Sequence, residues 1–232
     1  MTERFPLTPA IARTGRSFLR RSVKYLADNG VRQFLDIGSG IPTVGNVHEI
    51  AQGVAPRSRV VYVDIDPVAV SESLEILEGN QDATATRADV RSPGAILDNP
   101  QVRRLLDFDQ PVGVLLCAVL HFVPEDAEAR QTVDELVAAV APGSYLVISH
   151  AGTDDPAADD GVEVAQDVYK RQTATPFAMR TRSAVTGFFG GLELVEPGVV
   201  WSPQWRPEPD DPADFVANPQ LSVGLRGVGR KP

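Results

Sequence analysis

The chain has 232 residues, a mass of 25.0 kDa and 43% hydrophobic residues, enough to bury the core of one large domain or two small ones. Its 22 Lys and Arg against 31 Asp and Glu give a formal net charge of -9, which disfavours nucleic acid as a partner. The single cysteine, Cys117, cannot form an internal disulfide, and its apolar surroundings VGVLLCAVLHFV predict a small buried side chain. That run is too short to span a membrane, and the N-terminus lacks a signal peptide's apolar stretch, so we expect a soluble cytoplasmic protein.

Extended apolar runs alternate with helical patterns along the chain, which is typical of a parallel sheet covered by helices on both faces. We expect helices over residues 9–29, 42–53, 67–78, 93–107 and 124–141, and strands over residues 32–38, 59–64, 83–89, 111–120 and 144–150. Two further helices, over 160–172 and 182–189, precede two extended segments, 192–200 and 221–230, which flank a surface loop rich in Pro and Asp. No crossover helix separates these last two segments, so they must pair antiparallel.

Two features of these elements have more than one reading. In the first helix Arg13, Arg16, Arg20 and Lys24 recur every three or four residues, and we interpret this basic stripe as a solvated helix face. The Pro-rich loop contains three aromatic residues, which either close over a small apolar acceptor or pin the loop to the edge of the sheet: Trp201, Trp205 and Phe215. We favour the pinning role.

The stretch FLDIGSGIPT carries an acid, Asp36, just before the turn Gly38-Ser39-Gly40. Glycines at this place let the backbone approach a ligand closely and direct free N–H groups at it. A dinucleotide-binding turn would have a third glycine where Thr43 stands, and a pyrophosphate would be repelled by Asp36. A ligand with a cationic amino group or a sulfonium would instead be attracted. The alternative is a tight turn in which Asp36 bonds to nearby backbone.

The next two expected strands also end in acids. Asp64, before Ile65, is placed to accept hydrogen bonds from a ribose diol, which NAD and adenosyl cofactors share, whereas Asp66 reads as a helix cap. Asp89, before Val90, is placed to accept from the exocyclic amine of an adenine or to cap its own turn. The sequence therefore predicts three acids at one edge of the sheet.

In their order and spacing, several segments resemble a known family. DIGSG, VVYVDIDP, RADV and LLCAVLHFV look like class I S-adenosylmethionine-dependent methyltransferases. More closely, FLDIGSGIPTVGNVHEIAQ, AVLHFVPED, PGSYLVISH and LELVEPGVV are similar to the actinobacterial S-adenosyl methyltransferase family, once a domain of unknown function. The resemblance covers roughly residues 14–231.

The resemblance implies a doubly wound, Rossmann-like α/β fold with a seven-stranded, mostly parallel sheet, the last strand antiparallel, and helices on both faces. Residues 1–30 would be a helical segment packed on a methyltransferase domain of residues 31–232. S-adenosyl-L-methionine would lie across the strands' carboxyl ends, held by residues of the first four strand ends: Asp36, Gly38, Ser39, Gly40, Asp64, Ile65, Asp89, Val90 and Ala118. The family's usual N-terminal Tyr-Asp-Tyr-Leu-Leu-Gly-Gly-like stretch has no counterpart in this sequence.

A methyl acceptor that is protonated at neutral pH needs a base, and histidine is the natural one. His121, directly after the fourth strand, is our candidate catalytic residue, with a supporting role in its loop as the alternative; His150 is a weaker candidate and His48 reads as structural. The histidines have no metal-ligand spacing and no CxxC accompanies them, so no metal is expected. We expect methyl transfer to a small molecule; a module that binds the cofactor without catalysis and, less favoured, an NAD(P)-dependent oxidoreductase are the alternatives.

Overall fold

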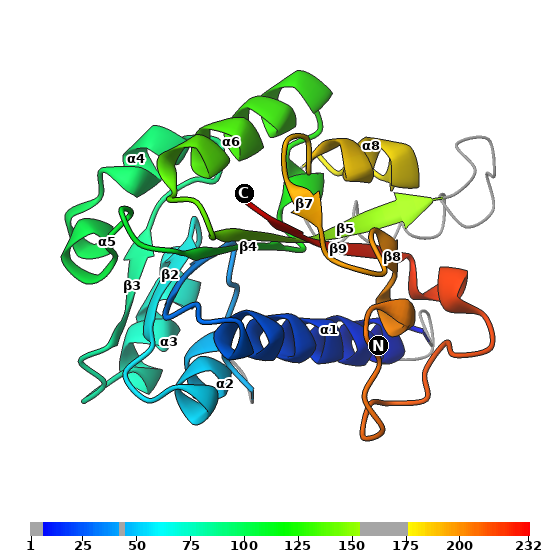
Figure 1. Cartoon of the computed structure of the whole chain (residues 1–232), viewed down its shortest axis with the longest axis horizontal. Helices are drawn as coiled ribbons and strands as arrows, with labels where there is room; N and C mark the ends of the chain where they lie inside the picture. Colours follow the sequence, from blue (N-terminus) through cyan, green and yellow to red (C-terminus); the bar gives the residue numbers. More distant parts are fainter. Residues whose placement is uncertain (1–6, 42–44, 154–175) are drawn as a thin grey trace.

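The computed structural model describes residues 7–41, 45–153 and 176–232, and they form one central sheet between two layers of helices (Figure 1). The strand order is β3-β2-β1-β4-β5-β9-β7, with β6 paired to β5 and β8 paired to β9. The expected doubly wound, Rossmann-like α/β fold is confirmed, with nine strands in the described residues instead of the predicted seven. One extra strand is β6 (Arg180–Thr181), and the other arises because the segment expected over 192–200 forms two short strands, β7 (Glu193–Leu194) and β8 (Val200–Trp201).

Five strands of the sheet are parallel, namely β1 (Gln33–Ile37), β2 (Arg59–Asp64), β3 (Ala83–Arg87), β4 (Gly113–Cys117) and β5 (Tyr145–Thr153). All except the edge strand β3 are mostly buried, which explains their largely apolar sequences. The last strand, β9 (Gly224–Arg230), runs antiparallel to β5 on one side and to β7 and β8 on the other. The predicted antiparallel pairing of the late segments is therefore confirmed.

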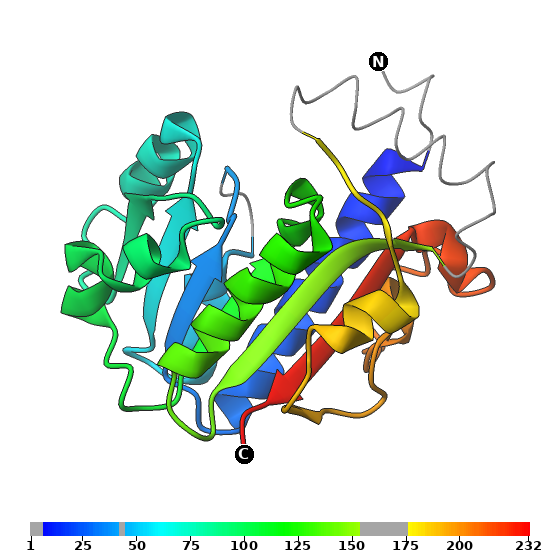
Figure 2. The same cartoon turned by 90° about the horizontal axis from the view of Figure 1, so that it is seen from above.

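Helices cover both faces of the sheet (Figure 1, Figure 2). One hydrophobic cluster joins the sheet to α1 (Thr8–Asp28) and α2 (Val47–Val54), with α3 (Pro67–Ile76) on the same side. The second cluster packs the opposite face against α4 (Pro93–Leu97), α5 (Pro100–Leu105), α6 (Asp126–Ala139) and α8 (Arg182–Gly187). In the described residues no helix is both long and apolar enough to cross a membrane.

Several predicted boundaries were wrong for local reasons. The helix expected over residues 42–53 begins only at Val47, because the Glu49 carboxylate accepts the backbone N–H of Asn46 at 2.7 Å and fixes the helix start there. The helix expected over 93–107 is two helices, with Asn99 capping the second at 2.9 Å from the N–H of Gln101. The predicted helix over 160–172 lies outside the described residues.

The basic stripe on α1 stays largely exposed to solvent, as we expected, but its side chains also pair with acids. The acidic part of the Pro-rich loop lies along it: Arg13 pairs with Asp214 at 2.9 Å and Arg20 with Glu208 at 2.8 Å. Lys24 pairs with the same Glu208 carboxylate at 3.0 Å. The loop therefore pairs with the stripe, while the side chains of Arg13 and Lys24 remain 54% and 47% exposed.

Aromatic side chains anchor the same loop. Trp205 is fully buried, with its ring centroid 5.3 Å from that of Phe18 and 6.0 Å from that of Tyr25, both on α1. Trp201 is buried in β8, where it pairs with Leu225 of β9. Trp205 and Trp201 thus support the pinning role, which is the reading we favoured.

Candidate functional site

The glycine turn after β1 and the acid at the tip of β2 are in direct contact. The backbone N–H of Gly40 donates to the Asp64 carboxylate at 2.8 Å, and the N–H of Asp66 donates to the other oxygen at 2.9 Å. Within the turn, the N–H groups of Gly38 and Ser39 donate to the Val63 carbonyl at 2.7 and 3.3 Å. The structure therefore brings together the turn and Asp64, and the carboxylate keeps acceptor capacity for further donors.

Asp36 lies beside them, beneath the turn. Side chains alternate along a strand, so Asp36 shares the α1 face of β1 with the buried Phe34. Only 5% of Asp36 is exposed, and burial together with the Asp64 charge raises its pKa to about 7, while Arg16 on α1 opposes the rise. A cation placed here would stabilise the ionised carboxylate.

Gly38 is required by both conformation and space. Its φ is +74°, and a Cβ at this position would lie 2.4 Å from Val119 Cγ2, in the segment after β4. Gly40 has a φ of +66°, but a Cβ added there would meet no neighbouring atom of the described residues within 4 Å, so they leave the space above it open. The turn thus packs tightly against the β4 segment at one glycine and presents bare backbone at the other.

The third predicted acid has a different neighbourhood. Both Asp89 oxygens accept from the Arg91 guanidinium, and Oδ1 also accepts the Arg91 backbone N–H at 2.9 Å, which lowers the pKa of Asp89. The contact with the Arg91 N–H is the turn-capping role that we gave as the alternative to binding an adenine amine. Val90 is buried in the core cluster that contains Ile37, whereas Ile65 is 51% exposed. Asp66 caps α3 through the N–H of Val68 at 2.9 Å, as we expected.

Ala118 follows β4 and is exposed, with a left-handed φ of +59°. Its N–H donates to the Ser149 carbonyl at 2.9 Å, so the strained residue is held between β4 and β5. Cys117, just before it, is partly rather than fully buried, and burial raises the pKa of its thiol. These features place Ala118 at the carboxyl edge of the sheet.

His121 does not directly follow the fourth strand as we expected, because β4 ends at Cys117 and His121 belongs to a short 3-10 helix, Leu120–Phe122. It is 2% exposed, with its ring centroid 4.4 Å from that of Phe122 and 4.8 Å from that of Phe177. Burial and the nearby His150 lower its pKa well below the usual value, so the imidazole is neutral. The neutral form accepts a proton, although a lowered pKa makes it a weaker base.

The other two histidines are also buried and neutral. The phenol oxygen of Tyr62 accepts the His48 backbone N–H at 2.9 Å and lies 2.8 Å from His48 Nδ1, which supports the structural reading. His150 is fully buried, and its pKa is lowered to about 4 by burial and by nearby Arg180 and Arg226. Sequence reasoning missed both arginines, and Arg16 was placed only in a surface stripe. A buried arginine leaves no periodic signal in the sequence.

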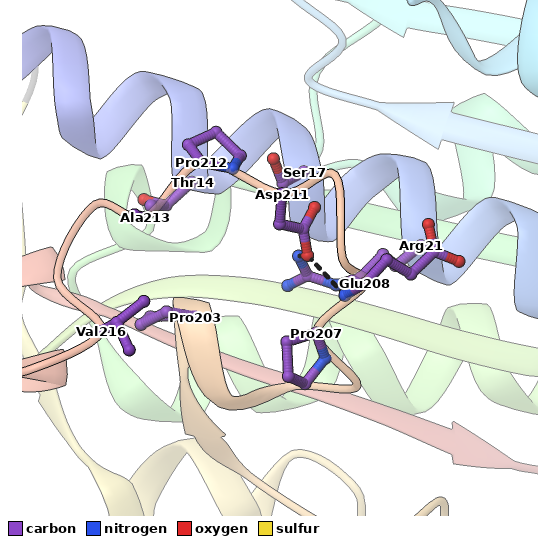
Figure 3. A pocket seen from close by; sticks show the side chains of 10 residues that line it. All are labelled: Thr14, Ser17, Arg21, Pro203, Pro207, Glu208, Asp211, Pro212, Ala213 and Val216. Atoms are coloured by element: carbon purple, nitrogen blue, oxygen red, sulfur yellow. Dashed lines mark hydrogen bonds and ion pairs between the residues drawn. The ribbon is translucent and has the colours of Figure 1, made fainter.

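A cavity of about 180 Å³ lies elsewhere, between α1 and the Pro-rich loop (Figure 3). Arg21 and Asp211, which form a buried ion pair, line it together with Glu208 and several proline side chains. None of the predicted site residues lines this cavity. We therefore do not place the cofactor there.

The strand-edge residues suit a nucleoside with a positively charged group. Gly40 offers open space above bare backbone, Asp64 retains lone pairs for hydroxyl donors, and the buried Asp36 carboxyl would be stabilised by a cation. These are the features that S-adenosyl-L-methionine requires of its binding site, since it carries a ribose, an amino group and a sulfonium.

Comparison with known proteins identifies the family. The model of the S-adenosyl methyltransferase family matches residues 1–232. A DUF574 family protein from Streptomyces avermitilis is 39% identical, with a TM-score of 0.89 over 100% of this chain and 88% of that one. A proposed methyltransferase from Thermobifida fusca is 38% identical, with a TM-score of 0.86 over 99% of this chain and 85% of that one.

A more distant structure shares the fold alone. The N-methyltransferase NodS from Bradyrhizobium japonicum is 17% identical, with a TM-score of 0.53 over 93% of this chain and 97% of that one. No curated protein matches the chain. With the family model spanning every residue, the chain belongs to the S-adenosyl methyltransferase family, whose cofactor is S-adenosyl-L-methionine.

Proposed function

We propose that this protein transfers a methyl group from S-adenosyl-L-methionine to a small-molecule acceptor by in-line displacement. The observation that carries the proposal is the contact between the glycine turn and the second-strand acid, Gly40 N–H to Asp64 at 2.8 Å, with Asp36 buried beside it. The cofactor supplies an electrophilic methyl carbon on a positively charged sulfur. The task left to the protein is to hold the acceptor in line with that carbon, and orientation alone is worth about 7 to 11 kcal/mol.

Each predicted site residue has a proposed role. Gly38, Ser39 and Gly40 approach the methionine part, Asp36 lies near its cationic groups, and Asp64 with Ile65 holds the ribose. Asp89 and Val90 bracket the adenine, and for this Asp89 must accept a donor beyond its Arg91 pair, which its remaining lone pairs permit. Ala118, exposed at the end of β4, lines the same crevice.

His121 is the proposed base for the acceptor. Its neutral state supports this role, and because it is only 2% exposed, side chains around it must move before an acceptor can reach it. The net charge of -9 favours a small molecule over a nucleic acid as acceptor. We further propose that the protein is cytoplasmic and that residues 31–232 form the methyltransferase domain on which 1–30 pack.

Calorimetric titration with S-adenosylmethionine, S-adenosylhomocysteine and NAD tests the cofactor assignment. We expect binding of both adenosyl ligands, and binding of NAD alone would contradict the proposal. Incubation with a donor labelled on its methyl group and an extract of small metabolites then tests catalysis. Label transferred to a small molecule is the expected result, whereas label that never leaves the donor indicates the alternative, a module that only binds the cofactor.

Replacing Asp64 with alanine tests the ribose contact. We expect S-adenosylhomocysteine binding to weaken by roughly 1 to 3 kcal/mol, since the hydroxyls lose a charged acceptor and Gly40 loses its partner. Asp66→Ala is the matched control, because that neighbouring acid caps α3 and should leave the affinity nearly unchanged. Equal affinities for the Asp64 variant and the unchanged protein would remove Asp64 from the site.

A further inference from the structure

The strongest unassigned feature is a buried arginine behind the carboxyl ends of β4 and β5. Arg180 in β6 is 4% exposed, and its strand pairs in parallel with the end of β5, where Gly152 is its partner in the register. A buried guanidinium is costly unless its donors are satisfied. The acceptors that bind this side chain are therefore the groups whose positions it fixes.

All five N–H groups of Arg180 have an acceptor. Nε donates to Asp126 Oδ1 at 2.8 Å, Nη1 donates to the Leu120 carbonyl at 3.1 Å, and Nη2 donates to the carbonyls of Val123 and Pro124 at 2.8 and 3.3 Å. The remaining Nη1 contact is to His150 Nε2 at 2.8 Å. An arginine has five donors in a rigid planar fork, so this arrangement uses the whole side chain.

Three of these contacts hold one short segment, residues 120–124, which carries His121. The N–H of Ala178 adds a fourth link to that segment by donating to the His121 carbonyl at 2.8 Å. At the other end of the segment, Val119 packs against Gly38 of the cofactor turn. The position of His121 relative to the turn therefore depends on the contacts that Arg180 makes.

The same guanidinium determines which nitrogen of His150 carries the proton. Arg180 can only donate, so His150 Nε2 must be the acceptor and must lack a proton. His150 Nδ1 then carries the proton and donates to the Ala151 carbonyl at 2.6 Å. His150 Nε2 could take up a proton only if its contact with Arg180 were broken, so His150 is no longer a candidate base.

We propose that Arg180 is a positioning residue, which holds the His121 segment against the cofactor turn and fixes His150 in one neutral tautomer. The claim that Arg180 matters for methyl transfer rests on the proposed function. The claim about the tautomer of His150 does not rest on it, because that tautomer follows from the contact between Arg180 and His150.

Nitrogen NMR of the protein labelled at its three histidines tests the proposal directly. In the unchanged protein we expect His150 to be protonated at Nδ1 only. The His48 signals are an internal reference, because His48 is also buried and its Nδ1 lies 2.8 Å from the Tyr62 hydroxyl instead of from a guanidinium. Protonation of His150 at Nε2, or a mixture of both forms, would overturn the proposal without any variant.

The variant Arg180→Lys keeps the charge but offers three donors in place of five. We expect loss of the single His150 tautomer, displaced His121 signals, and a fall in kcat of about tenfold or more, because a misplacement of about 1 Å can cost that much. The KM for S-adenosylmethionine and the affinity for S-adenosylhomocysteine should stay within about twofold, since Arg180 is not a proposed cofactor contact. Circular dichroism confirms that the variant is folded.

Arg130→Lys is the matched control. Arg130 lies over the same Phe188 ring as Arg180, at 5.6 Å against 5.4 Å, but it is exposed and its guanidinium donates to the Gly187 carbonyl instead of to His150 or residues 120–124. Equal spectral changes in the two variants, or an unchanged His150 tautomer in Arg180→Lys, would overturn the proposal. If the protein fails to bind S-adenosylhomocysteine, the proposed function fails, while the tautomer measurement still tests Arg180.

Discussion

The ionisation of Asp36 should control how tightly the cofactor binds. Burial and the nearby Asp64 charge raise the pKa of Asp36 to about 7, so near neutral pH a large part of the protein carries this carboxyl in its neutral form. A ligand with cationic groups at this place binds the ionised form more tightly, and by linkage it lowers the pKa of Asp36 in the complex. Affinity should therefore fall as the pH falls through 7.

The size of the effect follows from the pKa. With a pKa near 7 the ionised fraction falls from roughly three quarters at pH 7.5 to about one tenth at pH 6, so the affinity should fall about eightfold, or ~1.2 kcal/mol. Calorimetric titration with S-adenosylhomocysteine at both pH values measures it, and Asp36→Asn should bind with little dependence on pH over that range. Equal affinities of the unchanged protein at pH 6 and 7.5 would refute the reasoning.

The remaining predictions concern stability. The raised pKa of Asp36 means that the folded state binds the carboxyl proton more tightly than the unfolded state does. The free energy of unfolding therefore falls progressively as the pH rises from about 4 to 7. Asp36→Asn removes this loss and should raise the free energy of unfolding at pH 8 by at most about 4 kcal/mol. Gly38→Ala should destabilise the protein more than Gly40→Ala, because only the first added methyl group would overlap a neighbouring side chain. Gly40→Ala should cost roughly 1 to 2 kcal/mol, because its backbone is left-handed. Urea unfolding that ranks the two variants the other way would contradict the packing at Gly38. Asp211→Ala should cost roughly 3 kcal/mol, because it leaves the buried Arg21 guanidinium without its carboxylate. Asp214→Ala should cost about 1 kcal/mol or less, because its ion pair with Arg13 is more exposed. Equal losses of stability in urea unfolding would contradict this difference.

Much of the fold could be predicted because its signals are local. Buried parallel strands have continuous apolar sequences, and the cap that starts α3 is fixed by Asp66 itself. The contact between Gly40 and Asp64 was also within reach, because the carboxyl ends of adjacent parallel strands meet at one edge. The predicted acids of β1 and β2, Asp36 and Asp64, accordingly lie close enough for the charge of Asp64 to raise the pKa of Asp36.

The features that the sequence did not reveal depend on distant partners. The two-residue strand β6 exists only through its pairing with the end of β5. The stripe on α1 is paired with acids because residues such as Arg20 meet Glu208, which is 188 positions later in the chain. Arg180 likewise contacts carbonyl groups about sixty residues away, and no spacing rule connects them.

A crystal structure of the protein with S-adenosylhomocysteine tests the central claim most directly. We predict that the ribose hydroxyls donate to the Asp64 carboxylate, with the amino acid part over Gly38 to Gly40 and its ammonium group near Asp36. The ligand bound in another part of the molecule, or bound here with Asp64 and Asp36 out of reach of it, would contradict the account.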